Sequence, residues 1–484
     1  MKIKKILLEA CILMLAFCSI SSASVPALSG GAEFAHCRWT DLAARFPIPG
    51  VDGKIKDAPS PEILASWWSV FNDETLTVLI MTALENNRSL ASARASITDG
   101  RAQLGVSRAA GLPWLDSENY WRRSKNASDT GEKCIDIARL SIDTSWEIDI
   151  FGGRRQTIKA GAADLEAQYA ALNSAWVSLT SEIAMDYISL RALQEQLAIA
   201  RENLGAQRQT LDIIETRFKR GLDDALALEQ SKYTLEQTLS SIPPLETGAE
   251  RMKNSLAILA GMVPGALEET LSTPKPIPEV STDVIVGIPA NAMRQRPDIR
   301  EAELKLAAQI ARKKAAKADL WPKFFLDGSI GTETRSPAGG SLFEGPNNLY
   351  SFGPRITFPI FHWGAIRNNI KVQTAKQEQC LYAYEQAVLT AAVEVRNAIT
   401  SVLKERLRTD SLGKGITSAK SALAIAGDKY SRGLVDFNNV ISAQQALLSM
   451  EKDHAESRGQ TAIDMVALFK SLGGGWALMD AQSK

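Results

Sequence analysis

Few residues of this chain have types and spacings suited to catalysis or metal binding. Histidines, the usual general bases and zinc ligands, number 3 and lie far apart, at positions 36, 362 and 454. No HExxH, GxSxG or complete phosphate-binding loop occurs, and Gly413-Lys414-Gly415 lacks the rest of a nucleotide motif. Carboxylates scattered along predicted helices fit solvated faces better than an acid–base pair. The residue types therefore predict no enzyme, and no cofactor or metal requirement.

The composition argues against several binding functions. Lys plus Arg and Asp plus Glu number 55 each in 484 residues, whereas nucleic-acid-binding proteins carry a basic excess. The 5 cysteines fit no CxxC pattern, and the 10 methionines form no cluster that would indicate copper export. We therefore expect no nucleic-acid partner and no disulfide framework.

The amino-terminal residues read as an export signal. Lysines within residues 2–5 are followed by an apolar stretch at 12–18 and a small-residue cleavage site at 21–23. Residues 1–23 should therefore be removed. Beyond them, no apolar run approaches the ~20 residues of a membrane-spanning helix, so a membrane-integral form would have to use strands.

The same segment allows a second interpretation. Leu15 to Cys18 resembles a bacterial lipobox, although Phe17 occupies a position where a small residue is preferred. In that case residues 1–17 would be removed and Cys18 would be lipidated.

The sequence repeats itself once. Four short motifs recur in the same order at offsets of 209 to 212 residues. The pairs are 110–114 and 319–323, 147–152 and 357–362, 217–222 and 429–434, and 259–261 and 471–473. Such constant offsets predict two structural repeats, at 61–270 and 288–476. An extended segment (24–60), a linker (271–287) and a tail (477–484) complete the chain.

Each repeat should run helix, strand, loop, strand, long helix, tight turn and returning helix. The predicted helices are 73–109, 154–220 and 223–262, then 288–318, 364–432 and 436–472. A helix of about 65 residues would reach roughly 100 Å, a length that implies coiled-coil packing. Pro243-Pro244, inside the first returning helix, predicts a break, bend or bulge.

Apolar residues of the long helices follow heptad spacing. Intervals of 3 and 4 residues connect Leu165, Tyr169, Leu172, Trp176, Leu179 and Ile183, and likewise Leu381, Tyr384, Val388, Ala391, Val395, Ala398 and Val402. A second stripe in the later helix contains Leu389, Ala392, Ile399 and Leu403. Two stripes indicate a helix with two neighbours, as in a bundle or a closed ring.

The segments between the helices alternate apolar and polar residues. The predicted lipid-facing side chains are Leu140, Ile142, Trp146, Tyr350, Phe352, Ile356 and Phe358. This pattern fits strands between lipid and water, and it also fits half-buried soluble strands. Strand length and the export signal favour the membrane. Four strands cannot close a barrel and open edges are not tolerated in lipid, so several chains would have to pool their strands.

A set of motifs supports this interpretation. In order they are Trp67 to Asp73, Ala83 to Asn87, Trp146 to Gly152, Arg217 to Gly221, Arg294 to Ile299, Phe358 to Phe361, Arg432-Gly433 and Leu472 to Trp476. With them, residues 60–476 resemble the outer-membrane factor family of TolC-like and OprM-like exit ducts. The resemblance is strongest to the NodT-type branch that serves RND-type efflux pumps.

The resemblance implies a mainly α fold with a small β part. Three chains would form a twelve-stranded barrel in the outer membrane of a Gram-negative bacterium and a helical α-barrel in the periplasm. Its partners would be a periplasmic adaptor, an inner-membrane RND-type pump and outer-membrane lipid. The duct would be a passive conduit for expelled small molecules, and no motif in the sequence specifies which molecules they are. The alternatives are the exit duct of a type I protein-secretion system and a soluble exported coiled-coil scaffold, which explains the heptads only.

The resemblance also assigns two sets of site residues. The adaptor-contacting helix tips would be Arg220, Gly221 and Leu222, and Arg432, Gly433 and Leu434. The periplasmic gate would comprise Asp436, Asn438, Asn439, Ser442 and Gln445. By the resemblance, Asn438 takes the constricting position, and Ser442 and Gln445 take two positions that are often charged in relatives. All three are neutral and polar here, so we hypothesise closure by hydrogen bonds. Ordinary helix capping and solvation would explain both sets equally simply.

Overall fold

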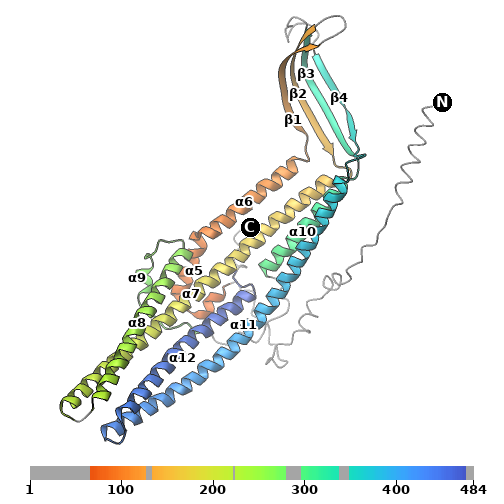
Figure 1. Ribbon diagram of the computed structural model, residues 1–484. Helices are drawn as coiled ribbons and strands as arrows, with labels where there is room; N and C mark the ends of the chain where they lie inside the picture. Colours follow the sequence, from red (N-terminus) through yellow and green to blue (C-terminus); the bar gives the residue numbers. More distant parts are fainter. Residues whose placement is uncertain (1–65, 127–132, 222–223, 280–295, 337–347, 476–484) are drawn as a thin grey trace, which may run out of the picture. The chain divides into compact units, whose positions relative to one another are not determined.

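The computed structural model describes residues 66–126, 133–221, 224–279, 296–336 and 348–475 (Figure 1). The first half contains the 3-10 helix η2 (Trp67–Phe71), α5 (Glu74–Asn86), α6 (Arg88–Ala109), β1 (Trp114–Asn126), β2 (Lys133–Ile148), α7 (Gly153–Lys219), α8 (Ala225–Leu259) and α9 (Glu268–Leu271). The second half contains α10 (Pro297–Ala318), β3 (Lys323–Ser336), β4 (Asn348–Thr357), α11 (Ala365–Ser431) and α12 (Phe437–Ser471).

The predicted tandem repeat is confirmed. The order α6, β1, β2, α7, α8 recurs as α10, β3, β4, α11, α12. The long helices α7 and α11 have 67 residues each, and the returning helices α8 and α12 have 35 each. At 1.5 Å per residue the long helices reach about 100 Å.

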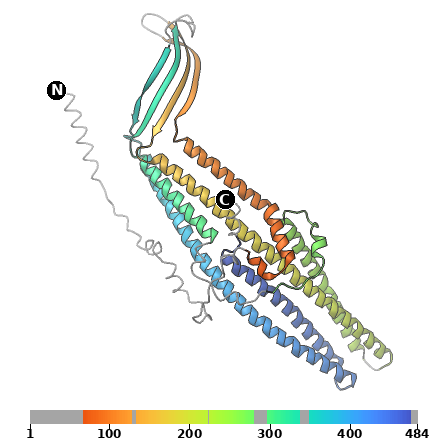
Figure 2. The same ribbon diagram turned by 180° about the vertical axis from the view of Figure 1, so that it is seen from behind.

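The strands and the helices follow the same lateral order. The sheet is antiparallel throughout, with the order β1-β2-β3-β4. Next to the sheet, α6, α7, α10 and α11 pack side by side in that order, and each leads into a strand or out of one (Figures 1 and 2). Farther from the sheet, α12 replaces α10 between α7 and α11, and α8 replaces α6 beside α7. The two repeats therefore share one layer of helices.

The first predicted helix, 73–109, is wrong as a single element. It is divided at Asn87, whose backbone is extended. The Asn87 side chain accepts a hydrogen bond from the N–H of Leu90 at 3.0 Å, which caps α6. Its amide also donates to the carbonyl oxygen of Leu259 at 2.8 Å, which ties this corner to the end of α8.

Of the outcomes predicted for the proline pair, the break is wrong, and the bend or bulge stays a prediction. Residues Ala225–Leu259 form one continuous helix that includes Pro243 and Pro244. The hydroxyl of Ser241 donates to the carbonyl oxygen of Thr238 at 2.8 Å, just before the pair. The remaining turns are held by the packing of α8 along α7.

The heptad seam forms much of the buried core. Trp176, Leu179, Ile183 and Leu190 of α7 are buried, as are Ala391, Val395, Ala398 and Val402 of α11. The second stripe divides: Ile399 is buried, whereas Leu389 is exposed in the single chain. Among the described residues, no helix is both long and apolar enough to cross a membrane.

Candidate functional site

One face of the sheet is apolar and exposed. Residues Leu140, Ile142, Trp146, Tyr350, Phe352, Ile356 and Phe358, predicted to face lipid, are between 36% and 83% exposed. The strand register aligns Ile142 with Ile330, and Ile330 with Tyr350, across three strands on this face. A surface of this kind has no cover within the described residues, and it is suited to an apolar surrounding.

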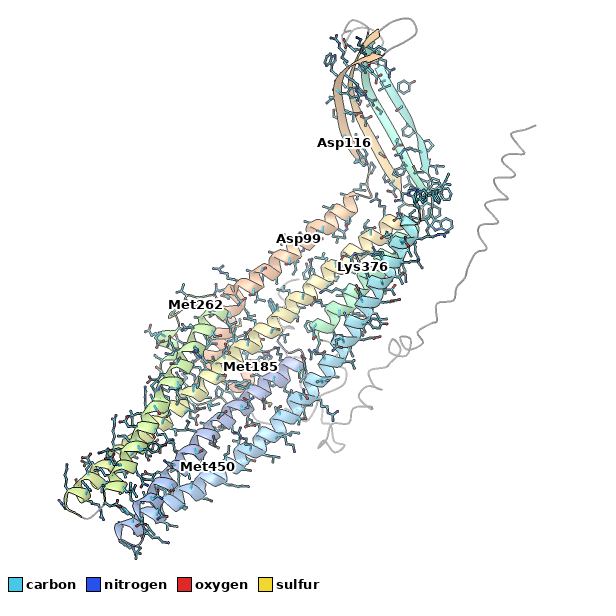
Figure 3. All side chains as sticks on the ribbon, in the orientation of Figure 1. Asp99, Asp116, Met185, Met262, Lys376 and Met450 are labelled. Atoms are coloured by element: carbon cyan, nitrogen blue, oxygen red, sulfur yellow. The ribbon has the colours of Figure 1, made fainter. Side chains whose placement is uncertain are left out.

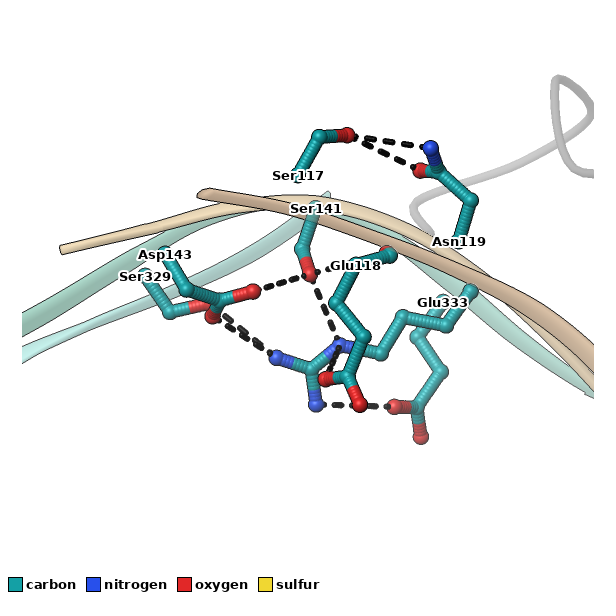
Figure 4. A network of polar contacts seen from close by, with 8 residues as sticks. Ser117, Glu118, Asn119, Ser141, Asp143, Ser329 and Glu333 are labelled. Atoms are coloured by element: carbon teal, nitrogen blue, oxygen red, sulfur yellow. Dashed lines mark hydrogen bonds and ion pairs between the residues drawn. The ribbon is translucent and has the colours of Figure 1, made fainter. Parts of the chain in front are cut away.

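The opposite face carries a cluster of polar and charged side chains that includes Glu118, Asp143 and Glu333 (Figure 4). Arg139 lies at its centre. The Arg139 guanidinium donates to Asp143 at 3.1 Å, Ser141 at 3.0 Å and Ser329 at 3.2 Å. Glu118 and Glu333 lie 3.9 and 3.8 Å from it. The cluster therefore links β1, β2 and β3 across the polar face, as expected for a surface in contact with water.

A second ion pair extends this polar face to β4. The Arg355 guanidinium donates to Asp327 at 2.6 Å and lies over the ring of Phe325. Asp327 also accepts from the hydroxyl of Ser145 at 2.7 Å. Each strand thus contributes a charged side chain to the polar face: Glu118, Arg139, Asp327 and Arg355.

Aromatic side chains gather where the strands join the helices. Phe151 stacks on Trp321 with ring centroids 5.3 Å apart, although the two belong to different repeats. Phe361 contacts Trp363 at 4.9 Å, and Trp363 is 88% exposed with a left-handed backbone. These rings border the apolar face at the helix end of the sheet, the position of an aromatic girdle at a membrane surface.

Below the polar face lies a polar cavity of about 480 Å³. Its walls come from α6, α7, α10, α11 and the adjoining ends of β2 and β3. Glu147 accepts from Arg154 at 2.6 Å, and Asp164 forms an ion pair with Arg312 of the other repeat. Charged side chains therefore continue from the sheet to the helical layer.

The two predicted tips have the geometry of tight helix ends. Gly221 and Gly433 have φ of +71° and +70°, a region that favours glycine. The Leu434 N–H donates to the Lys429 carbonyl oxygen at 2.9 Å, which closes a Schellman-type turn. Arg220, Arg432 and Leu434 are exposed, and Leu222 lies outside the described residues, as does Cys18.

The five predicted gate residues lie together at the start of α12 and are all exposed. Asp436 is the N-cap residue, and the Asn439 amide donates to its carbonyl oxygen at 3.2 Å. Asn438, Ser442 and Gln445 are spaced 4 and 3 residues apart and therefore share one face of the helix. Their assignment as gate and tip residues stays a prediction.

An apolar cluster that was not predicted from the sequence packs against the opposite face of this turn. Phe437, Val440 and Ile441 pack with Ile214 of α7 and Ala227 of α8. Nearby, the guanidinium of Arg217 lies 5.1 Å from the ring centroid of Tyr430 in α11. These contacts join the two helix pairs at their tips. The one signal for them in the sequence is the helical spacing of the apolar residues 437, 440 and 441.

A sheet with one apolar and one polar face, continued by a layer of paired helices, defines the subunit of a membrane duct. The family model described as "Outer membrane efflux protein" matches residues 79–262 and 288–474. The chain therefore belongs to the outer membrane efflux protein family, and it is an outer-membrane channel protein that extends into the periplasm.

Individual relatives agree with this assignment. Nodulation protein T of Rhizobium leguminosarum bv. viciae is 27% identical over 87% of this chain and 86% of its own length. Outer membrane protein OprJ of Pseudomonas aeruginosa is 28% identical over 85% of this chain and 86% of its own. Among solved structures, the outer-membrane channel OprN matches with a TM-score of 0.82 at 30% identity, covering 89% of this chain and 95% of that one.

Proposed function

We propose that three copies of this chain form the exit duct of a tripartite efflux pump. An inner-membrane RND-type transporter would expel small molecules, a periplasmic adaptor would connect it to the duct, and the duct itself would be a passive conduit. The observation that carries the proposal is the two-faced sheet, in which β1 and β3 follow the helices α6 and α10, and β2 and β4 continue into the long helices α7 and α11.

The edges of the sheet support assembly. Within the described residues, β1 and β4 each have one neighbour, so each leaves a row of backbone groups unpaired. Such edges are not tolerated in lipid, whereas three chains with four strands each could close a twelve-stranded barrel.

The helices offer a matching surface between chains. On α11, Tyr382, Leu389, Val393 and Leu407 are exposed and separated by intervals of 7, 4 and 14 residues. These intervals keep them on one stripe of a coiled coil. The stripe would pack against a neighbouring chain, which supports a tube of twelve helices.

The relatives support the efflux role. They include the toluene efflux pump outer membrane protein TtgF, 29% identical, and the cation efflux system protein CusC, 28% identical. Their differing cargoes fit a duct whose selectivity comes from its pump. The exposed turns at Gly221 and Gly433 would contact the adaptor, and Asn438 would lie at the narrowest point of the mouth.

The test is single-channel recording of the purified protein in planar lipid bilayers. Wild type should give discrete conductance steps. Asn438→Leu should change the conductance or the open probability, because it replaces a hydrated amide at the mouth by an apolar side chain. Asn397→Leu, an exposed change on α11, is the control. Conductance unchanged by Asn438→Leu would show that the gate is misplaced, and absence of channels would refute the duct.

A further inference from the structure

A polar groove lies between α7, α8 and α12, and the predicted gate residue Gln445 is one of its lining residues. Its volume is about 520 Å³. Met450, labelled in Figure 3, marks the stretch of α12 that forms one wall. The lining residues are Gln207, Tyr233, Thr234, Gln237, Thr238, Ser241, Gln445, Leu448, Ser449, Lys452 and Asp453.

The groove exists because α8 and α12 both pack on α7 but make few contacts with each other. On α8, Thr234, Thr238 and Ser241 are spaced 4 and 3 residues apart and so share one face. The Thr234 hydroxyl donates to the Gln230 carbonyl oxygen at 2.9 Å, as Ser241 does to Thr238. The hydroxyls of Thr234 and Ser241 therefore use their protons within the helix and keep a lone pair free to accept a hydrogen bond.

Gln207 points to a missing partner. It lies on the groove wall and is 5% exposed, and its Oε1 has no donor among the described residues. A buried amide oxygen without a donor costs about 1–3 kcal/mol, so such atoms are normally satisfied. Because the amide can turn by half a rotation, this side chain can either accept from a bound molecule or donate to it.

The lining chemistry selects the class of ligand. Amides and hydroxyls dominate, and Leu448 is the one aliphatic side chain. A docked protein helix would need a central apolar anchor. A phosphate would need excess positive charge, but the adjacent Asp453 balances the charge of Lys452. Tyr233 is 65% exposed, so its ring is available to stack on the C–H face of a sugar.

We propose that this groove binds a saccharide. The ligand would be neutral and rich in hydroxyl groups, held by the Gln207, Gln237 and Gln445 amides and by the hydroxyls of α8, with Tyr233 against a sugar ring. The placement of the groove in the periplasm rests on the proposed function. Two sources share this chemistry: the glycan of the cell wall that surrounds the tube, and a saccharide carried through it.

The test is binding of the purified full-length protein to two probes. A soluble oligomer of four N-acetylglucosamine units is titrated by calorimetry, and purified cell-wall sacculi are used for co-sedimentation. Gln207→Met keeps the volume but removes the amide, and Tyr233→Ala removes the ring. Both should weaken binding at least tenfold. Gln460→Met, the same substitution at an exposed site of α12 outside the groove, should leave binding unchanged.

The outcomes separate the explanations. Binding of both probes with loss in the variants supports the wall glycan, and binding of the soluble probe alone supports a carried saccharide. Binding of neither probe would show that the groove holds only water and overturn the proposal. Weakened adaptor binding in the variants, without saccharide binding, would overturn it in favour of a protein partner. Single-channel recordings of the same variants should match wild type, so failure of this inference is distinguishable from failure of the duct.

Discussion

Replacing Phe352 by arginine should prevent stable insertion of the sheet, whereas the same replacement at the adjacent Ser351 should be tolerated. The two residues are neighbours in β4 and face opposite ways. Phe352 is 77% exposed on the apolar face, and Ser351 is paired with Ser329 on the polar face, beside the Arg139 cluster. The comparison therefore tests which face of the sheet contacts lipid, because the strand and the introduced arginine are the same in both variants.

The size of the effect follows from the geometry of β4. Its 10 residues span about 33 Å at 3.3 Å per residue. With a tilt of about 40°, this gives a height of about 25 Å, the thickness of an apolar band, and Phe352 lies near its middle. Arginine at that depth costs about 2–4 kcal/mol per chain, or roughly 6–12 kcal/mol for three chains. Ser351→Arg should cost at most about 1 kcal/mol, because the polar face is solvated.

The assay is urea-induced unfolding in lipid vesicles, together with the amount of each variant in the outer-membrane fraction. Phe352→Arg should shift the unfolding midpoint strongly downward and reduce the membrane-bound fraction. If Ser351→Arg were the more damaging change, the assignment of the two faces would be reversed. If the two changes were equally damaging, the two faces of β4 would not differ in their surroundings, and the assignment of one face to lipid would fail.

Three further predictions concern the helical part. Gly433→Ala should lower the free energy of unfolding by about 1 kcal/mol, because the left-handed backbone at this position strains any residue with a Cβ. Gly427→Ala is the control: it lies inside α11 with open space where its Cβ would be, so it should raise the free energy of unfolding by about 0.5–1 kcal/mol in urea titration. Arg296→Met should cost roughly 2–3 kcal/mol because this buried guanidinium bonds two carboxylates and a carbonyl oxygen, while the exposed Arg300→Met should change stability by less than about 0.5 kcal/mol. Burial raises the pKa of Asp186, so its favourable contribution to folding stability is present in acid and is lost as the pH rises through that pKa. The stability of Asp186→Asn relative to wild type should therefore increase between pH 4 and pH 7, and a constant difference would contradict the assignment.

Much of the helical architecture could be predicted because its signals are long and periodic. The four duplicated motifs place α7, α8, α11 and α12 to within a few residues. The division at Asn87 was missed because the apolar pattern continues across it, and the bond from Asn87 to Leu259 depends on a residue 172 positions away. At Pro243, packing of α8 along α7 outweighs the local preference for a break.

The site was predictable only where it depends on alternation along one strand. Period-two contrast identified the apolar face, and the observed exposure of Phe352 and Ile142 agrees with it. The Arg139 cluster could not be found in this way, since Ser329 lies 190 residues from Arg139. The groove at Gln207 likewise depends on three helices that only tertiary packing brings together.

The central claim, a threefold duct, is tested most directly by imaging the mature protein after detergent extraction from membranes and determining its symmetry. The account predicts threefold tubes in which a short strand-built segment continues into a long helical shaft. Soluble monomers, dimers or particles of another symmetry would contradict it.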